Sequence, residues 1–249
     1  MSDHDTINVL FVASEAAPLV KVGGLGDVAG SLPLALRKIS PSENNGIKLD
    51  VRLVIPFHSL ISQRFENFQL ISSFSVPHPS GKIPARAFLT YINDMPIYLI
   101  EGSSILSDES VYSSDTYADG RKYIFFSLAV LELVKKINWH VDILHGNDWH
   151  TALSIYNLRN AHKQDVFFKK TKSVLTLHNL PFMGGDTKDI FNEFGIRQCD
   201  CTELPKWARH FPLPLGMYAA DHILTVSPNY AQEILTPEYG CGLQDFLFN

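Results

Sequence analysis

The chain has 249 residues, of which 45% are hydrophobic and 19% are charged. This length and composition allow a sizeable buried core and exclude a disordered, collagen-like or disulfide-scaffold protein. The formal net charge of −5 comes without a clustered basic patch, so we expect neither nucleic acid nor an anionic membrane as a partner. No apolar run approaches the length of a membrane span, and the acidic, polar start lacks the features of a secretory signal. The sequence therefore predicts a cytoplasmic protein or a processed protein of an organelle.

Short apolar runs alternate with helical patterns along the chain. Residues 7–13 predict a strand buried on both faces, residues 27–38 carry apolar side chains at helical spacing, and residues 49–55 predict the next strand. This alternation predicts an α/β fold with a doubly wound, Rossmann-like parallel sheet, and a single domain over residues 1–249. The other expected elements are a hairpin at 87–92 and 96–101, helices at 121–137, 151–161 and 231–235, and strands at 141–145, 173–177 and 222–226.

A glycine-rich loop follows the first expected strand. In open α/β sheets the ligand binds beyond the carboxyl ends of the strands, so this loop is a candidate site. It carries Lys21 and reaches Gly23 and Gly24 where it enters a helix. Glycines let the backbone approach a ligand closely, and a helix start presents free N–H groups and a positive dipole end to an anion. The loop is therefore a candidate diphosphate site, and a glycine-rich turn with a solvated lysine is the structural alternative.

The same glycines resemble a dinucleotide fingerprint, which makes a nicotinamide-dependent oxidoreductase a rival hypothesis. Gly24, Gly26 and Gly30 form this pattern. The spacing argues against it, because ten residues separate the first strand from Gly24 and Asp50 lies at the start of the second strand rather than at its end. No P-loop sequence is present.

Polar side chains also follow two later strands. Asp148, Trp149 and His150 come after one of them, and His178 and Asn179 come after the other. Histidine and asparagine supply donors and acceptors without a net charge, which suits the recognition of sugar hydroxyls. The structural alternatives are a helix cap for Asp148, a core position for Trp149 and a satisfied structural residue for His178. Because all of these residues are expected at one edge of the sheet, they form the main candidate site.

No metal site is expected. His145 and His150 are five positions apart and do not share a helix face as paired ligands would. Cys199, Cys201 and Cys241 lack the second pair that a tetrahedral zinc site needs, and an odd cysteine count indicates a reducing compartment.

Two further segments are weak candidates. Asp3-His4-Asp5 has the D-x-D form of metal-dependent glycosyltransferases, but it precedes the first strand and is expected to fray. The loop at 101–117 is rich in serine and acidic residues, and we expect a mobile surface loop there. Neither segment is assigned a role in the site.

Five motifs, in order, resemble those of a known family. Together they make the chain resemble the ADP-glucose-dependent starch and glycogen synthases, which are retaining glycosyltransferases of family 5 with two Rossmann-like domains in the GT-B arrangement. The resemblance runs from the first strand nearly to the last residue. The motifs are KVGGLGDV at 21–28, HGNDWH at 145–150, TLHN at 176–179, VSP at 226–228 and TPEYG at 236–240.

The resemblance implies a reaction and a role for each matching residue. Glucose would pass from ADP-glucose to the 4-hydroxyl at the nonreducing end of an α-1,4-glucan, with retained configuration and without a metal or another cofactor. The implied catalytic residues are Asp148 and His178, the implied donor-binding residues are Lys21, Gly23, Gly24 and Asn179, and the implied supporting residues are Trp149 and His150.

The sequence also departs from the family pattern. Residues 119–123 read DGRKY where the family has an asparagine followed by an Arg-Phe or Arg-Tyr pair, and residues 180–185 read LPFMGG where A-Y-Q-G is commoner. A different acceptor preference is therefore expected. The chain ends at Asn249, before the family's second domain, so we expect the N-terminal, acceptor-side half of a GT-B enzyme, nearly inactive alone and partnered by a C-terminal domain in cis or in trans. The alternative is a non-catalytic glucan-binding or partner-binding module with the same fold.

Overall fold

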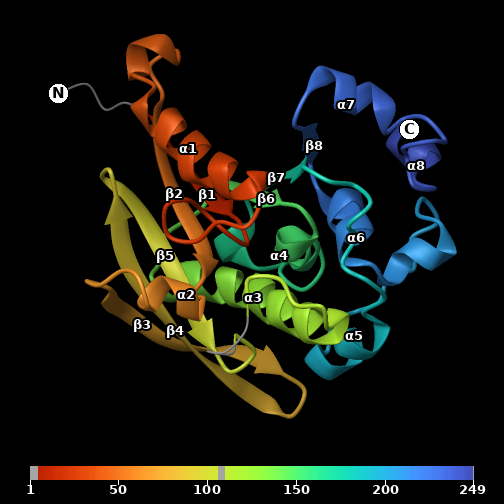
Figure 1. Ribbon diagram of the computed structural model, residues 1–249, viewed down its shortest axis with the longest axis horizontal. Helices are drawn as coiled ribbons and strands as arrows, with labels where there is room; N and C mark the ends of the chain where they lie inside the picture. The colour runs from red at the N-terminus through yellow and green to blue at the C-terminus, as the bar shows by residue number, and fades with distance from the viewer. Residues whose placement is uncertain (1–4, 106–109, 249) are drawn as a thin grey trace.

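The computed structural model describes residues 5–105 and 110–248, and these form an eight-stranded sheet with helices on both faces (Figure 1). The strand order is β3-β4-β5-β2-β1-β6-β7-β8. The six strands from β5 to β8 are parallel, whereas β4 pairs antiparallel with both β3 and β5. The strands are β1 Thr6–Val12, β2 Lys48–Pro56, β3 Gln69–His78, β4 Gly81–Ile92, β5 Met95–Gly102, β6 Ile143–Asn147, β7 Lys172–Leu177 and β8 His222–Thr225.

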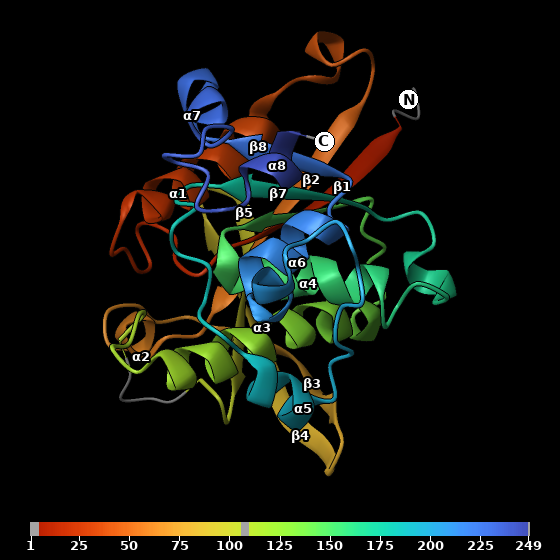
Figure 2. The ribbon, with the colours of Figure 1, turned by 90° about the vertical axis from the view of Figure 1, so that its right-hand side faces the viewer.

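The helices divide between the two faces of the sheet (Figure 2). One face packs against α1 and α2 through a cluster that includes Phe11, Leu53 and Ala29. The other face carries the larger cluster, which is built on α3, α4, α5 and α6 and includes Phe125 and Ile155. The helices are α1 Gly24–Lys38, α2 Ser59–Ser62, α3 Thr116–Lys136, α4 Trp149–Arg159, α5 Lys188–Phe194, α6 Pro212–Ala219, α7 Pro228–Glu233 and α8 Gln244–Phe248.

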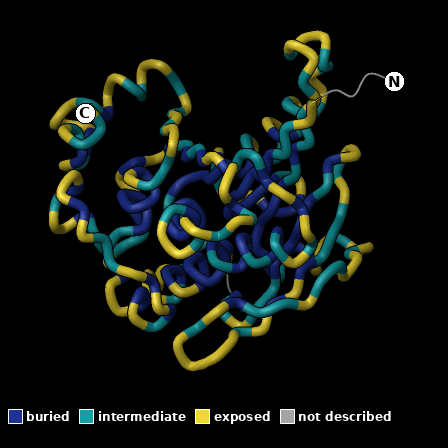
Figure 3. Tube along the Cα trace, turned by 180° about the vertical axis from the view of Figure 1, so that it is seen from behind, coloured by how far each residue is buried: buried dark blue, intermediate teal, exposed yellow. Residues whose placement is uncertain are grey.

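The central strands are buried on both faces, as their continuous apolar runs predict. Leu10, Phe11 and Val12 alternate between the two clusters although all three are fully buried. Figure 3 shows this buried centre, while the trace through α7 and α8 is mostly half-buried or exposed. The doubly wound α/β fold predicted from the sequence is therefore confirmed for the parallel part of the sheet.

The antiparallel edge is the main feature that the sequence analysis missed. The sequence analysis expected no strand between residues 56 and 86, but Pro77 and His78 lie at the end of β3 and pair with Lys82 and Gly81 of β4. Proline is tolerated there because β3 is an edge strand, where one row of backbone groups has no partner strand. The expected hairpin is confirmed as β4 and β5, with Asn93 and Asp94 at positive φ in its turn.

The strand order reverses at β1, and this positions the site. From β1 the chain passes through α1 to β2 on one side, whereas β6 and β7 lie on the other side. A ligand crevice forms in such folds beyond the carboxyl ends of the strands at this switch point. The loops after β1, β6 and β7 are the three loops that the sequence analysis singled out.

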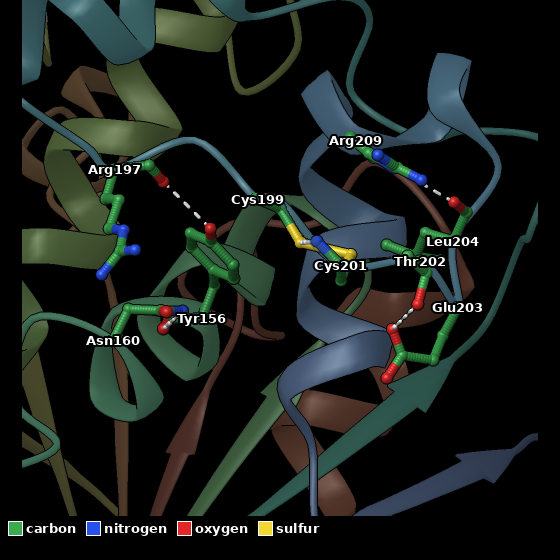
Figure 4. Close-up of a disulfide and its surroundings, with 9 residues drawn as sticks. All are labelled: Tyr156, Asn160, Arg197, Cys199, Cys201, Thr202, Glu203, Leu204 and Arg209. Atoms are coloured by element: carbon green, nitrogen blue, oxygen red, sulfur yellow. Dashed lines mark hydrogen bonds between the residues drawn. A yellow bond between two sulfur atoms is a disulfide. The ribbon is translucent and has the colours of Figure 1, made fainter.

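Cys199 and Cys201 form a disulfide in the segment between α5 and α6 (Figure 4). The sequence analysis did not predict this bond, and the third cysteine, Cys241, is free. The backbone N–H of Cys201 also lies 3.4 Å from Sγ of Cys199. On the α4 side, Tyr156 donates its hydroxyl hydrogen to the carbonyl oxygen of Arg197 at 2.9 Å. This hydrogen bond anchors the segment to α4 two residues before Cys199. The two cysteines of a C-x-C triplet can be bonded to each other or free, and their spacing in the sequence does not decide between the two states.

The helices within residues 5–105 and 110–248 include none that is both long enough and apolar enough to cross a membrane.

Candidate functional site

A cavity of about 930 Å³ lies at the carboxyl ends of β1, β6 and β7. Its size is within the range of small-molecule sites. Seven of the eight predicted site residues line it, and the eighth, Lys21, does not. The seven are Gly23, Gly24, Asp148, Trp149, His150, His178 and Asn179.

Asp148 connects two strand ends at the floor of this cavity. Its Oδ1 accepts hydrogen bonds from the backbone N–H groups of His178 at 2.8 Å and Asn179 at 3.3 Å. Its backbone has a φ of 55°, a conformation that is uncommon for residues other than glycine and that occurs at functional sites. Asp148 occupies the N-cap position of α4, but its side chain makes no cap hydrogen bond, so the helix-cap alternative is wrong.

The environment of Asp148 changes its acidity. Burial raises the pKa of this carboxyl to about 6, although the two backbone N–H groups that it accepts act in the opposite direction. At neutral pH Asp148 is therefore mainly ionised, but it can take a proton within about one pH unit. A carboxylate with this acidity, next to a ligand cavity, suits the positioning of hydroxyl groups and proton transfer.

His178 lies beside Asp148 and contacts a third strand-end residue. Its Nε2 lies 3.0 Å from Oδ1 of Asn147, whose Nδ2 donates to the carbonyl oxygen of Val12 at 3.0 Å. Burial lowers the pKa of His178, so the ring is neutral at physiological pH. The nearby His145 is also neutral, because burial lowers its pKa to about 4, and its Nε2 lies 2.7 Å from Oγ1 of Thr176.

The glycine loop is held by a carboxylate from the end of β1. The side chain of Glu15 is buried and accepts hydrogen bonds from the backbone N–H groups of Val22 and Gly23. Tyr112 donates its hydroxyl hydrogen to Oε1 of Glu15 at 3.0 Å and lies 2.8 Å from Oγ of Ser14. The N–H of Gly23, expected to face a diphosphate, is therefore occupied by Glu15, and Gly24 presents the start of α1 to the cavity.

Lys21 lies on the surface next to this loop. Its Nζ is 2.7 Å from Oδ2 of Asp27, and both side chains are about half exposed, at 48% and 61%. Exposed ion pairs of this kind contribute only about 0–1 kcal/mol. Lys21 can therefore exchange Asp27 for another anion at little cost, although it does not line the cavity in this structure.

An aromatic cluster forms the wall of the cavity on the α4 side. The ring of His150 lies 4.2 Å from that of Trp149, 4.5 Å from that of Tyr123 and 4.9 Å from that of Tyr112, measured between centroids. Burial lowers the pKa of His150 well below its ordinary value. Gly184, with a φ of +91°, passes so close to Trp149 that a Cβ would lie 2.5 Å from the indole ring. Trp149 and His150 thus form a closely packed part of the cavity wall, and their supporting role stays a prediction.

A buried ion pair lies behind the same wall, in the segment that departs from the family pattern. Asp119 and Lys122 are 2.7 Å apart and both are buried. Lys122 also donates to the carbonyl oxygen of Ser110 at 3.2 Å, and Asp119 accepts from the backbone N–H of Ser113 at 2.9 Å. The pair therefore ties the loop before α3 to the helix, and Asp119 contributes to the cavity lining.

The remaining candidates do not join the site. Asp50 lies at the amino end of β2, where Arg37 and Arg52 bind its carboxylate, so it is not placed as a ribose-binding carboxylate would be. Asp3 and His4 of the D-x-D triplet lie outside the described residues. Among the described residues, no group of three or more His, Cys, Asp or Glu side chains is arranged to hold a metal ion.

Three residues of the site have no role in the sequence analysis. Glu15, Tyr112 and Asn147 each act through a contact between segments far apart in the chain. Asn147 lies inside the motif at 145–150, so the sequence could place it at a strand end. Its contact with His178 could not be predicted from the sequence. Tyr112 lies in the loop at 101–117 that was expected to be mobile, of which residues 106–109 lie outside the described residues; here Val111 is fully buried and Tyr112 lines the cavity.

Comparison with known proteins identifies the family. The family model described as the starch synthase catalytic domain matches residues 8–249. The chain belongs to this family. The resemblance that the five motifs indicated is therefore confirmed.

The chain is also similar to individual proteins of this kind. It is 33% identical over 251 residues to glycogen synthase of Bacillus subtilis and 36% identical over 247 residues to glycogen synthase of Clostridium kluyveri. In both cases the match covers 97% of this chain but only 49% and 50% of the relative, so the chain spans about half the length of these curated relatives.

A solved structure supports the fold. The catalytic domain of starch synthase IV from Arabidopsis thaliana, bound to ADP and acarbose, matches 99% of this chain with a TM-score of 0.81 at 22% identity. The match covers 50% of that chain. The predicted Rossmann-like half of a GT-B glycosyltransferase fold is thereby confirmed.

Proposed function

We propose that this chain is the acceptor-side half of a retaining glucosyltransferase that moves glucose from ADP-glucose to the nonreducing end of an α-1,4-glucan. The observation that carries the proposal is the convergence of Asp148, His178, Asn179 and Gly24 on one cavity at the sheet edge. Membership of the starch synthase catalytic domain family supports the substrate class. The similar starch synthase IV domain, which is described as bound to ADP and acarbose, adds support for a nucleotide and a glucan-like ligand in this fold.

The geometry suits a sugar in three ways. Uncharged hydrogen-bonding groups from His178 and Asn179 face the cavity together with the carboxylate of Asp148. Trp149 supplies an apolar ring in the cavity lining against which a pyranose ring can pack. Fixed groups of this kind position a substrate for reaction without a further loss of entropy in the reacting step.

The donor phosphates would lie toward the glycine loop. In the proposed transfer, the bond from C1 of glucose to the diphosphate oxygen breaks, a bond from C1 to O4 of the acceptor forms, and the hydroxyl proton leaves with the departing ADP. Negative charge develops on the diphosphate, so a cation that reaches it stabilises the transition state more than the ground state. Lys21 is the candidate, because its surface pair with Asp27 is weak enough to be exchanged.

The proposal includes the division of labour between two domains. The chain spans about half of its curated relatives, and ligands of two-domain enzymes bind in the cleft between the domains. A C-terminal GT-B domain, in cis or in trans, is therefore the proposed partner, and the chain alone is expected to be nearly inactive. The cytoplasmic location also stays part of the proposal, and cell fractionation tests it.

A chimera tests the proposal directly. This chain replaces the matching half of Bacillus subtilis glycogen synthase, and incorporation of labelled glucose from ADP-glucose into malto-oligosaccharide is measured. The proposal expects no incorporation by the chain alone, incorporation by the chimera, and a loss of at least about a hundredfold in the chimera with His178→Ala. The proposal is wrong if the chain alone elongates glucan, or if a folded chimera binds malto-oligosaccharide but transfers no glucose, the result expected of a non-catalytic glucan-binding module.

A further inference from the structure

The side chain of Asn147 lies between the backbone of β1 and the ring of His178. Its Nδ2 donates to the carbonyl oxygen of Val12 at 3.0 Å, and its Oδ1 lies 3.0 Å from Nε2 of His178. The reverse orientation of the amide would place its oxygen against the oxygen of Val12 and lose that bond. Asn147 is fully buried, and its backbone N–H donates to Oγ1 of Thr151 at 2.6 Å, so neither its side chain nor its backbone has freedom to turn.

This contact determines which nitrogen of His178 carries the hydrogen. An amide oxygen only accepts, so the hydrogen bond requires a hydrogen on Nε2. In the neutral ring the lone pair is then on Nδ1, and Nδ1 makes no hydrogen bond to any residue that the structure describes. The second ring in the neighbourhood, His145, is engaged by Thr176 and does not compete for Asn147.

We propose that Asn147 is a positioning residue that holds His178 in the Nε2–H tautomer, so that Nδ1 accepts a hydrogen bond from a hydroxyl group of the sugar in the cavity. The nature of the ligand rests on the proposed function, whereas the tautomer rests on the contacts of Asn147 alone. In the opposite tautomer His178 would present an N–H and could not accept a hydroxyl hydrogen. Asn147 touches the ring and not the cavity, so it acts on the ligand only through His178.

Nuclear magnetic resonance measures the tautomer without any activity. The full chain is labelled with ¹⁵N at histidine, its ring signals are recorded near neutral pH, and those of His178 are assigned by their loss in the His178→Phe variant. The proposal expects a protonated Nε2 and an unprotonated Nδ1 in the unsubstituted chain. A protonated Nδ1 as the main form overturns it, and this result needs no variant of Asn147 to fold.

Substitution then tests whether Asn147 is the cause. Asn147→Leu keeps the approximate volume and removes the acceptor, so we expect a loss of tautomer preference at His178 and an affinity for malto-oligosaccharide up to about tenfold lower. Asn157→Leu is the matched control, because buried Asn157 also donates its Nδ2 to a backbone carbonyl oxygen, that of Leu153 at 2.9 Å, but does not contact His178. We expect the His178 signals of this control to match those of the unsubstituted chain.

The outcomes separate the two proposals. An unchanged His178 spectrum in a folded Asn147→Leu variant, or the same change in both variants, overturns the role of Asn147. A correct tautomer with no change in the Nδ1 signal when malto-oligosaccharide is added overturns the sugar contact and counts against the proposed function, while the tautomer assignment stands.

Discussion

The carboxylate of Asp148 and the backbone N–H of His178 are joined by a hydrogen bond of 2.8 Å that connects the end of β6 to the end of β7. Through this bond one side chain sets the relative positions of two groups that face the cavity. The bond also places a buried carboxyl next to a neutral histidine, an arrangement that makes both groups sensitive to pH.

The acidity of Asp148 predicts a specific dependence of stability on pH. The folded-state pKa of about 6 lies above the ordinary value of 3.8, so folding takes up a proton between these values. The free energy of unfolding should therefore rise as the pH falls through 6, by as much as about 3 kcal/mol. Asp148→Asn keeps the acceptor oxygen and removes the titration, so the stability of the unsubstituted chain relative to this variant should increase from about pH 7.5 to about pH 4.5.

Urea unfolding of both proteins at the two pH values measures this difference. Asp165→Asn is a useful control, because its hydrogen bond to Lys135 lowers the pKa of Asp165 below the ordinary value of 3.8, so this carboxyl titrates below both pH values and its relative stability should change little between them. A relative stability that is constant or falls with acidification would show that Asp148 is not a carboxyl of raised pKa.

Tyr112 is predicted to stabilise the glycine loop through Glu15. Tyr112→Phe removes the hydroxyl that Glu15 accepts at 3.0 Å, so we expect a loss of about 1–2 kcal/mol in the free energy of unfolding and weaker ligand binding. The control is Tyr117→Phe, since the hydroxyl of Tyr117 donates to Glu193 at 3.3 Å on the exposed surface and its loss should cost less than about 0.5 kcal/mol. Equal losses in the two variants would contradict the role given to Tyr112.

Two glycines of α1, Gly24 and Gly30, are predicted to differ in their effect on stability. A Cβ at Gly30 would lie 2.3 Å from the carbonyl oxygen of Ala17, so Gly30→Ala should lower the free energy of unfolding by about 2 kcal/mol or more. A Cβ at Gly24 meets nothing within 4 Å, so Gly24→Ala should leave stability unchanged or slightly higher while it narrows the cavity and weakens ligand binding. Thermal unfolding and ligand titration of both variants check this contrast, and the reverse order of stability would refute it.

The disulfide predicts the thiol content of the chain. The sequence has three cysteines, and Cys199 and Cys201 are bonded while Cys241 is free. Titration with a thiol reagent in denaturant should find one thiol per chain before reduction and three after it. Three thiols in protein purified without a reductant would contradict the bond between Cys199 and Cys201.

The sequence was sufficient for the parallel core but not for the edge of the sheet. Strands such as β1 have continuous apolar runs because both faces are buried, and such runs are easily recognised. β3, with the sequence QLISSFSVPH, contains serine and proline and is only partly buried, because it packs on one face at an edge. A strand of this type depends on its pairing with β4, which local sequence does not reveal.

The site shows the same division between local and distant information. Asp148 and His178 could be found because each directly follows a strand with a clear pattern. The contact between Tyr112 and Glu15 joins residues 97 positions apart, and the contact between Asn147 and His178 joins residues 31 positions apart. Such pairs are created by the packing of the sheet, so sequence patterns could identify the candidates but not the hydrogen bonds that position them.

The most direct test of the central claim is the binding of malto-oligosaccharide to this chain, measured by calorimetry. The account predicts that His178→Ala lowers the affinity by about tenfold or more, while His140→Ala leaves it unchanged, since exposed His140 stacks on Phe167 before the amino end of β6. Equal affinity of the His178→Ala variant and the unsubstituted chain, with both proteins folded, would contradict the assignment of this cavity as the sugar site.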